Sequence, residues 1–467
     1  MTPPADDATE TVTSDDAFAA LEAPTPGTAP SPGRLGINYY KLLTASGISN
    51  LGDGIGLIAY PWLASAITRN PILIALVAVV QRLPWLVFSL PAGVITDRND
   101  RRKLMVWSNA ARAVLTTAVA LMVLLRQGDL PGPDSVADSQ LIVSTDLVLY
   151  LVLLLATLSL GVAEVLYDNS GQTFMPSVVA SDKLEKANGR MWSVEMIANT
   201  FAGPPLGALL IAVAFSLSFF VDAATFALSA AIIASISVSV KPRPPKEQAT
   251  SWTSELAEGV RWLWSHELLR PMAIILGLMN GLGTLTGALL VLFAQEVLDT
   301  SATEFALLNT GGAIGGVIGG WVAGSVAKRI GTGPSLWLTL LGGAVTNVVI
   351  GLTSWWGITW FMFAVFMMLA VLWNVITVSL RQTIIPDELL GRVNSVYRFF
   401  AWGMMPIGAL LGGLIVSITD RYGSRELALR LPWFIAAGGS VLLFVFGAPR
   451  LSTAKIEAAR SAATADT

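Results

Sequence analysis

The sequence predicts an all-α polytopic membrane protein with twelve transmembrane helices in two pseudo-symmetric six-helix bundles. Hydrophobic residues make up 54% of the 467 positions and charged residues only 13%, about half the charged share of a typical soluble protein. Apolar stretches of about 20 residues, the length that a helix needs to cross a bilayer, recur along the chain. Motifs of the first half return in the second half, which indicates two similar bundles.

The predicted spans are separated by short polar connections. Their length and their lack of strict alternation favour helices over the strands of a membrane barrel. The twelve spans are 40–66, 72–96, 104–125, 147–168, 190–214, 217–239, 272–296, 304–326, 335–353, 358–380, 394–418 and 431–448.

The composition divides the chain into five segments. Residues 1–37 are rich in Pro, Thr, Ala and Asp and contain no apolar signal-peptide core, so we expect a disordered cytoplasmic tail. Residues 38–239 form the N-terminal six-helix bundle, 240–270 a cytoplasmic linker, 271–449 the C-terminal six-helix bundle and 450–467 a loose cytoplasmic tail. The linker contains an amphipathic helix, because Leu256, Val260 and Leu263 share one face while Glu255 and Glu258 lie elsewhere.

The positions of the basic residues predict the orientation. With both termini in the cytoplasm, five of the 29 Lys and Arg residues fall in outside loops, three fall within helices, and the remaining majority fall in cytoplasmic segments. This bias is what the positive-inside rule requires. We therefore expect a multi-pass protein of a bacterial-type plasma membrane.

Several classes of chemistry have no residues to support them. The chain has no Cys and a single His, which excludes disulfides and zinc sites built from sulfur and nitrogen ligands. It has no P-loop and no nucleophile–base set, so we expect neither an enzyme nor an ATP-driven pump. We expect no cofactor and no metal; the partners are a small-molecule substrate, protons and membrane lipids, without nucleic acid, and the protein works as a monomer.

The two halves share short motifs at equivalent places. QTFMP (172–176) and LEKANGR (184–190) follow the fourth span, and QTIIP (382–386) and LLGRVNS (389–395) follow the tenth. Between the second and third spans of each half, Gly93-x-x-x-Asp97-Arg98 is echoed by Gly324-x-x-x-Lys328-Arg329. Such internal repeats are typical of secondary transporters.

The motifs carry a resemblance to a known family. GVITDRNDRR (93–102) resembles the signature loop of the major facilitator superfamily, and Gly203-Pro204-x-x-Gly207 resembles the Gly-Pro motif of its drug/proton antiporters. SNLGDGIGLIAYPWLA (49–64) and QRLPWLVFSLPAG (81–93) are similar to the branch that contains macrolide-efflux and enterobactin-export proteins. Two departures are that Asp100 stands where the signature usually has Gly, and that the fourth span lacks the Arg of many related exporters.

The resemblance implies the major facilitator fold and a role for the charged loop. In the family, this loop bridges to the other half and holds the outward-open state closed on the cytoplasmic side. The resemblance implies the same latch here, formed by Gly93, Asp97, Arg98, Arg101 and Arg102.

Charged residues inside the predicted spans are the candidates for proton coupling. A charge in the hydrocarbon costs several kcal/mol, so each one needs a partner or a function. The coupling candidates are Asp53, Glu195 and Glu164, with Asp53 first because it lies near mid-membrane beside glycines. The candidate charge partners are Arg82, Arg112, Asp168, Asp222 and Arg398. Judged by depth along the helices, Asp53 could pair with Arg82, and Arg112 with Glu164. We expect Asp222 to lie near the outer, solvent-exposed end of its helix. The alternative is that these charged residues form static ion pairs that hold the helices together.

Polar and aromatic residues within the spans are the candidates for a substrate cavity, namely Asn50, Trp62, Trp85, Asn199, Asn280, Trp373 and Trp402. The sequence and the resemblance together predict proton-coupled export of amphipathic small molecules, as in drug efflux, by alternating access. The alternatives are a dedicated siderophore or metabolite exporter, an inward symporter, a lipid flippase and a sensor that does not transport.

Overall fold

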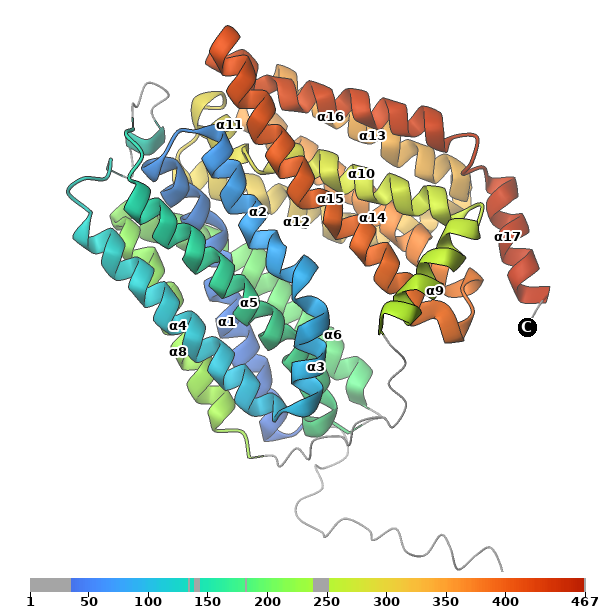
Figure 1. Cartoon of the computed structure of the whole chain (residues 1–467), viewed down its shortest axis with the longest axis horizontal. Coiled ribbons are helices and arrows are strands. Elements are labelled where there is room, and N and C mark those ends of the chain that lie inside the picture. Colours follow the sequence, from blue (N-terminus) through green and yellow to red (C-terminus); the bar gives the residue numbers. More distant parts are fainter. Residues whose placement is uncertain (1–34, 133–134, 138–142, 181–182, 238–251, 466–467) are drawn as a thin grey trace, which may run out of the picture.

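The structure is a computed structural model that describes residues 35–132, 135–137, 143–180, 183–237 and 252–465. The predicted tail up to residue 34 and the first part of the predicted linker lie outside the described residues. Figure 1 shows two helical bundles side by side, one from each half of the chain. Among the described residues, ten helices are long and apolar enough to cross a membrane, and Pro71–Val87 is a shorter apolar helix. The predicted all-α, multi-span fold is therefore confirmed.

The N-terminal bundle contains the helices of the first half of the chain. The second predicted span is divided between two helices, and the fifth between two α-helices and a π-helical segment. The elements are α1 (Ile37–Ile67), α2 (Pro71–Val87), α3 (Ser89–Arg98), α4 (Arg101–Leu125), the 3₁₀ turn η1 (Ser135–Ala137), α5 (Leu147–Val178), α6 (Leu184–Met196), the π-helix η3 (Ile197–Ala202), α7 (Gly203–Val213) and α8 (Phe215–Ala234).

Prolines account for the division of the fifth span. Pro204 and Pro205 have no N–H to donate, so the carbonyl groups one turn earlier lose their α-helical partners. The preceding turn, Ile197–Ala202, is π-helical. Such π-bulges are frequent at functional sites.

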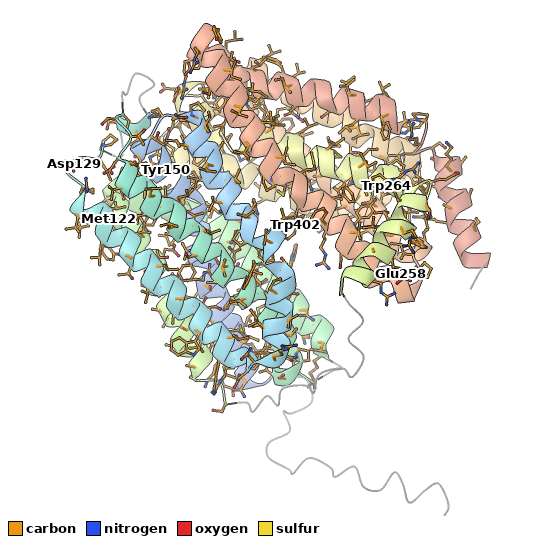
Figure 2. The ribbon with its side chains drawn as sticks, viewed as in Figure 1. Met122, Asp129, Tyr150, Glu258, Trp264 and Trp402 are labelled. Atoms are coloured by element: carbon orange, nitrogen blue, oxygen red, sulfur yellow. The ribbon has the colours of Figure 1, made fainter. Side chains whose placement is uncertain are left out.

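The C-terminal bundle contains α10 (Leu269–Gly287), α11 (Leu290–Glu296), α12 (Ala302–Ile330), α13 (Thr332–Leu352), α14 (Trp356–Ile384), α15 (Asp387–Tyr422) and α16 (Arg425–Gly447). Two further helices flank it. The amphipathic helix α9 (Trp252–Ser265) packs on α15 with Leu263 buried and Glu258 paired to Arg392, and Figure 2 shows Glu258 and Trp264 on it. α17 (Thr453–Ala465) forms a helix where the sequence predicts a loose tail, because Leu451 and Ile456 are fully buried.

The bundles contact one another mainly through α2 with α15 and through α7 with α12. At one end, Trp62 of α1 packs against Phe305 of α12, with ring centroids 5.6 Å apart. We call this the Arg69 end, after the residue between α1 and α2, and the opposite end, which carries Arg98 and α9, the Arg98 end. In Figure 1 the ribbons converge at the Arg69 end, near α11, and diverge toward α3, α6 and α9.

Candidate functional site

A cavity of about 530 Å³ lies where the two bundles face each other. Its charged lining residues are Asp53, Arg82, Arg112, Glu164 and Asp222, and all of them come from the N-terminal bundle. The C-terminal bundle contributes an uncharged wall of Gly287, Ala288, Leu290, Val291, Phe305 and Asn309. The cavity thus has one ionisable side and one largely apolar side.

The central feature of the ionisable side is an ion pair between α1 and α4. Arg112 donates through Nη2 to Oδ1 of Asp53. The Arg112 side chain is only 3% exposed, whereas that of Asp53 is 26% exposed and borders the cavity. One partner is therefore fixed in the bundle and the other can be reached from the cavity.

Several contacts hold Arg112 in place. Its Nη1 atom lies 3.3 Å from Oγ of Ser49 and 3.4 Å from Oδ1 of Asn109. Its guanidinium carbon lies 3.9 Å from the centre of the Phe226 ring, a cation–π geometry. Asn109 in turn donates to Ser229 at 2.8 Å. These contacts from three helices hold the guanidinium in one position.

Glycines on α1 explain how Asp53 reaches this position. A Cβ atom on Gly52 would lie 2.5 Å from Oδ1 of Asp222 on α8. A Cβ atom on Gly54 would lie 2.8 Å from Cα of Gly203 at the start of α7. Neither contact is possible with a larger residue, so the two glycines let α1 lie against α7 and α8 at the level of Asp53.

The Gly-Pro motif belongs to the same crossing of helices. A Cβ atom on Gly203 would lie 2.5 Å from Cα of Gly54, and one on Gly207 would lie 2.9 Å from the carbonyl oxygen of Ile55. Pro204 is buried, and the π-helix before it places Asn199 on the cavity wall. The motif therefore lies directly behind Asp53.

The other carboxylates surround the ion pair at different depths. Asp222 is 3% exposed and its Oδ1 atom has no hydrogen-bond partner among the described residues, so the expected wet position at the end of its helix is wrong. Glu164 lines the cavity, and Asp168 lies one turn along on α5. Glu195 accepts a hydrogen bond from Ser46 at 2.7 Å and is not among the residues that line the cavity.

The ion pairs in the structure differ from those predicted from the depth of each residue along its helix. Asp53 bonds to Arg112 and not to Arg82, because the Arg82 side chain is exposed and faces the cavity. Arg112 also interacts electrostatically with Glu164, Asp168 and Asp222. Arg398 is exposed on α15 and does not join this cluster.

The candidate cavity residues divide into two groups. Trp85 and Asn199 lie on the wall, and the ring of Trp85 meets that of Trp402 across the bundles at 5.4 Å; Figure 2 shows Trp402 on α15 where it faces α2. The remaining candidates lie off the wall. Trp62 and Trp373 are buried in the core, Asn50 donates to the carbonyl of Ser46, and Asn280 donates to that of Ala401.

The charged loop lies at the Arg98 end. Arg101 donates to the carbonyl of Thr173 at 2.9 Å, and Arg102 donates to that of Ile236. Both bonds stay within the N-terminal bundle. Gly93 has open space around it and Arg98 is exposed, whereas the side chain of Asp97 lies outside the described residues. The latch between the bundles therefore stays a prediction, and it concerns the outward-open state, in which the resemblance implies that the cytoplasmic side is closed.

Sequence reasoning missed two groups of residues. Tyr60 and Asn309 line the cavity, but a tyrosine or asparagine in a span has no signal of depth or direction. Arg69, Glu296 and Arg425 form a charged cluster that joins the bundles at the Arg69 end. Nothing in the sequence groups these three, because they lie far apart along the chain.

Comparison with known proteins agrees with this architecture. The sequence model described as Major Facilitator Superfamily matches residues 42–409. The chain is 24% identical over 443 residues to the multidrug efflux pump Tap of Mycolicibacterium fortuitum, covering 88% of this chain and 95% of that protein. It is 24% identical to the enterobactin exporter EntS of Citrobacter koseri, covering 82% and 86%.

Solved structures show the same fold at low sequence identity. A bacterial metal transporter superposes with a TM-score of 0.64 and 16% identity, over 90% of this chain and all of that one. An inward-facing bacterial homologue of the lysosomal transporter Spinster gives 0.61 and 12%, over 91% and 96%. With two helical bundles facing a shared cavity and a family match over most of its length, the chain belongs to the major facilitator superfamily, a family of membrane transporters of small molecules.

Proposed function

We propose that this transporter exports amphipathic small molecules in exchange for protons, by alternating access. The observation that carries the proposal is the Asp53–Arg112 pair, in which a buried guanidinium holds a carboxylate that borders the shared cavity. A carboxylate that water can reach from one side at a time is the group that proton coupling requires. The apolar wall opposite suits the hydrophobic part of a substrate.

The proton acts by changing the partner of Arg112. While Asp53 is ionised, it accepts the hydrogen bond from Arg112. When Asp53 takes up a proton, Arg112 loses that partner and is drawn toward Glu164 and Asp222, with which it already interacts. Such a switch alters the packing of α4 against α1 and α8, and it couples protonation to the relative tilt of the bundles.

The direction of transport rests on orientation. We infer that the Arg98 end is cytoplasmic, because the basic loop and most of the other basic connections lie there. The ribbons diverge at this end (Figure 1), and we infer an inward-facing state that takes up substrate from the cytoplasm. We place the protein in a bacterial plasma membrane as a monomer, with both termini inside.

Drug efflux is the first candidate activity, because two of the relatives that match over most of their own length are named multidrug efflux pumps. The second candidate is a dedicated siderophore exporter. Two observations favour it: the relative named enterobactin exporter, and the exposed guanidinium of Arg82 in the cavity, which offers an anionic cargo a partner.

The test is transport in proteoliposomes with an imposed pH gradient. A panel of fluorescent cationic and neutral amphiphiles is compared for wild type, Asp53→Asn and the control Asp129→Asn, whose carboxylate lies on an exposed loop. We expect wild type and Asp129→Asn to move at least one dye only when the pH gradient is present. We expect Asp53→Asn to lose this gradient-driven movement. Movement that continues unchanged in Asp53→Asn would contradict the assignment, and movement without any gradient would contradict proton coupling.

A further inference from the structure

A second cavity, of about 130 Å³, lies inside the C-terminal bundle, between α10, α13, α14 and α16. Its walls are mainly aromatic and aliphatic, with Phe363, Phe366, Trp433, Leu282, Leu340 and Leu369 among them. None of the described residues that line it is charged. It is therefore separate in both position and chemistry from the ionisable side of the central cavity.

Several polar side chains of this second cavity donate hydrogen bonds within their own helices. The hydroxyl of Thr339 donates to the carbonyl of Leu336 and that of Ser440 to the carbonyl of Ala436. The amide of Asn347 donates to the carbonyl of Gly343 at 2.7 Å. Because these bonds are made within each helix, the walls offer few donors to a polar ligand, and an apolar occupant is favoured.

Glycines of α10 connect this cavity to the central one. Gly287 lines both cavities. Gly283, one turn earlier, lines the second cavity, and a Cβ atom placed on either glycine would meet no heavy atom within 4 Å. The wall between the two spaces is thus thin and without side chains at this point.

The volume decides what the second cavity can hold. An apolar protein cavity of about 150 Å³ stays dry and binds benzene, and 130 Å³ is close to that size. A charged group would lose its hydration without gaining a partner. A single uncharged ring fits both the volume and the aromatic lining.

We propose that the second cavity is a subsite for one uncharged aromatic ring of the substrate, while the polar part of the same molecule stays in the central cavity. This inference rests on the proposed function for the identity of the substrate. The presence of a ring-binding site can be measured without transport.

The first experiment measures occupancy through a single cysteine. Because the chain contains no Cys, Gly283→Cys gives one thiol in the second cavity, and Gly438→Cys, on an exposed part of α16 with open space around it, gives a matched control. Alkylation by N-methylmaleimide is followed with benzyl alcohol or with heptan-1-ol, its straight-chain counterpart. At about ten times its Kd, benzyl alcohol should slow labelling at position 283 about tenfold by occupancy.

The straight-chain alcohol and the position 438 variant distinguish a ring site from an acyl-chain site and from a bilayer effect. We expect heptan-1-ol to give little protection at position 283 and neither alcohol to affect position 438. Absence of protection by benzyl alcohol overturns the subsite. Equal protection by heptan-1-ol shows an acyl-chain site instead, and equal slowing at position 438 shows an effect of the alcohols on the bilayer.

The second experiment links the subsite to transport. Gly283→Leu fills the cavity, and Gly438→Leu is its control. The KM for benzyltriethylammonium should rise about tenfold or more in Gly283→Leu, and the KM for tetraethylammonium should not change. Equal KM changes for both cations overturn the subsite. If wild type transports no probe, the proposed function fails while the labelling result still decides the ring site.

Discussion

Arg69 and Glu296 join the two bundles at the Arg69 end, with Nη1 of Arg69 3.3 Å from Oε1 of Glu296. The Glu296 side chain is 6% exposed, and Arg425 donates to its other oxygen at 2.7 Å. Next to them, Gln295 accepts from Arg69 at 2.7 Å and donates to Ser65 at 2.9 Å. The buried carboxylate of Glu296 thus pairs with one guanidinium group from each bundle, and separation of the bundles at this end would break its pair with Arg69.

Glu296→Gln should open the Arg69 end. Removing one partner of a buried charge pair costs about 2–5 kcal/mol, and 1.4 kcal/mol already shifts an equilibrium about tenfold. The measurement is maleimide labelling of Ser65→Cys, a position fully buried in the closed state. We expect labelling to become at least about tenfold faster in the Glu296→Gln background.

The matched control is Glu304→Gln. Glu304 lies at the start of α12 in a capping box with Ser301 and makes no contact between bundles in the described hydrogen bonds. Labelling at position 65 that is as slow in Glu296→Gln as in Glu304→Gln would show that Glu296 does not hold this end closed.

Arg112→Met should destabilise the protein by about 3–5 kcal/mol, because it leaves Asp53 without its cationic partner. Removing both charges of the ion pair, in Arg112→Met with Asp53→Leu, should recover a large part of this loss. Unfolding in detergent with increasing denaturant measures both variants. A double variant less stable than Arg112→Met alone would mean that Arg112 acts mainly through other residues.

Gly315→Ala should destabilise the contact between α12 and α14 by about 1–3 kcal/mol. The added Cβ atom would lie 1.9 Å from the carbonyl oxygen of Ala364, so the helices must move apart. Gly320→Ala on the same helix is the control, because a Cβ atom there meets nothing within 4 Å. Thermal denaturation of the purified variants compares them, and equal melting temperatures would refute the packing argument.

His266 should make stability depend on pH. Its Nδ1 atom accepts hydrogen bonds from the backbone N–H groups of Leu268 and Leu269, both at 3.2 Å, at the start of α10. Burial lowers the pKa of the His266 imidazole below its ordinary value of 6.5, while the neighbouring Glu267 carboxylate acts in the opposite direction. The unfolded chain therefore binds the proton more readily than the folded one.

It follows that the contribution of His266 is complete above about pH 6.5 and is lost as the pH falls through the lowered folded pKa. His266→Asn keeps a capping oxygen that does not titrate. We expect the melting temperature of this variant to fall less than that of wild type between pH 7.5 and about pH 5. The same decrease in both proteins would assign the pH dependence to other groups.

The sequence was sufficient for the fold because each span carries its own signal. Apolar length and composition predict the helices one at a time, and repeated motifs such as QTFMP and QTIIP reveal the two halves. The division at η3 was partly predictable, since Pro204-Pro205 removes backbone donors. The described part of α17 was not expected, because its burial depends on only a few residues, such as Leu451 and Ile456.

The site was harder to predict because depth along a helix does not determine direction. Counting residues places Asp53 and Arg82 at matching levels, but Arg82 faces the cavity and Arg112 faces α1. The close approach that creates the pair depends on Gly52 and Gly54. The sequence shows that these glycines allow another helix to approach α1 closely, but it does not show which helix does so.

The most direct test of the central claim is the release of protons when substrate binds to the purified transporter in unbuffered detergent solution, at a starting pH low enough for Asp53 to be protonated before the substrate is added. The substrate is one identified by transport, and wild type is compared with Asp53→Asn and with Asp129→Asn. The account predicts that wild type and Asp129→Asn release protons on binding and that Asp53→Asn does not. Equal proton release from Asp53→Asn would contradict the claim that Asp53 carries the proton.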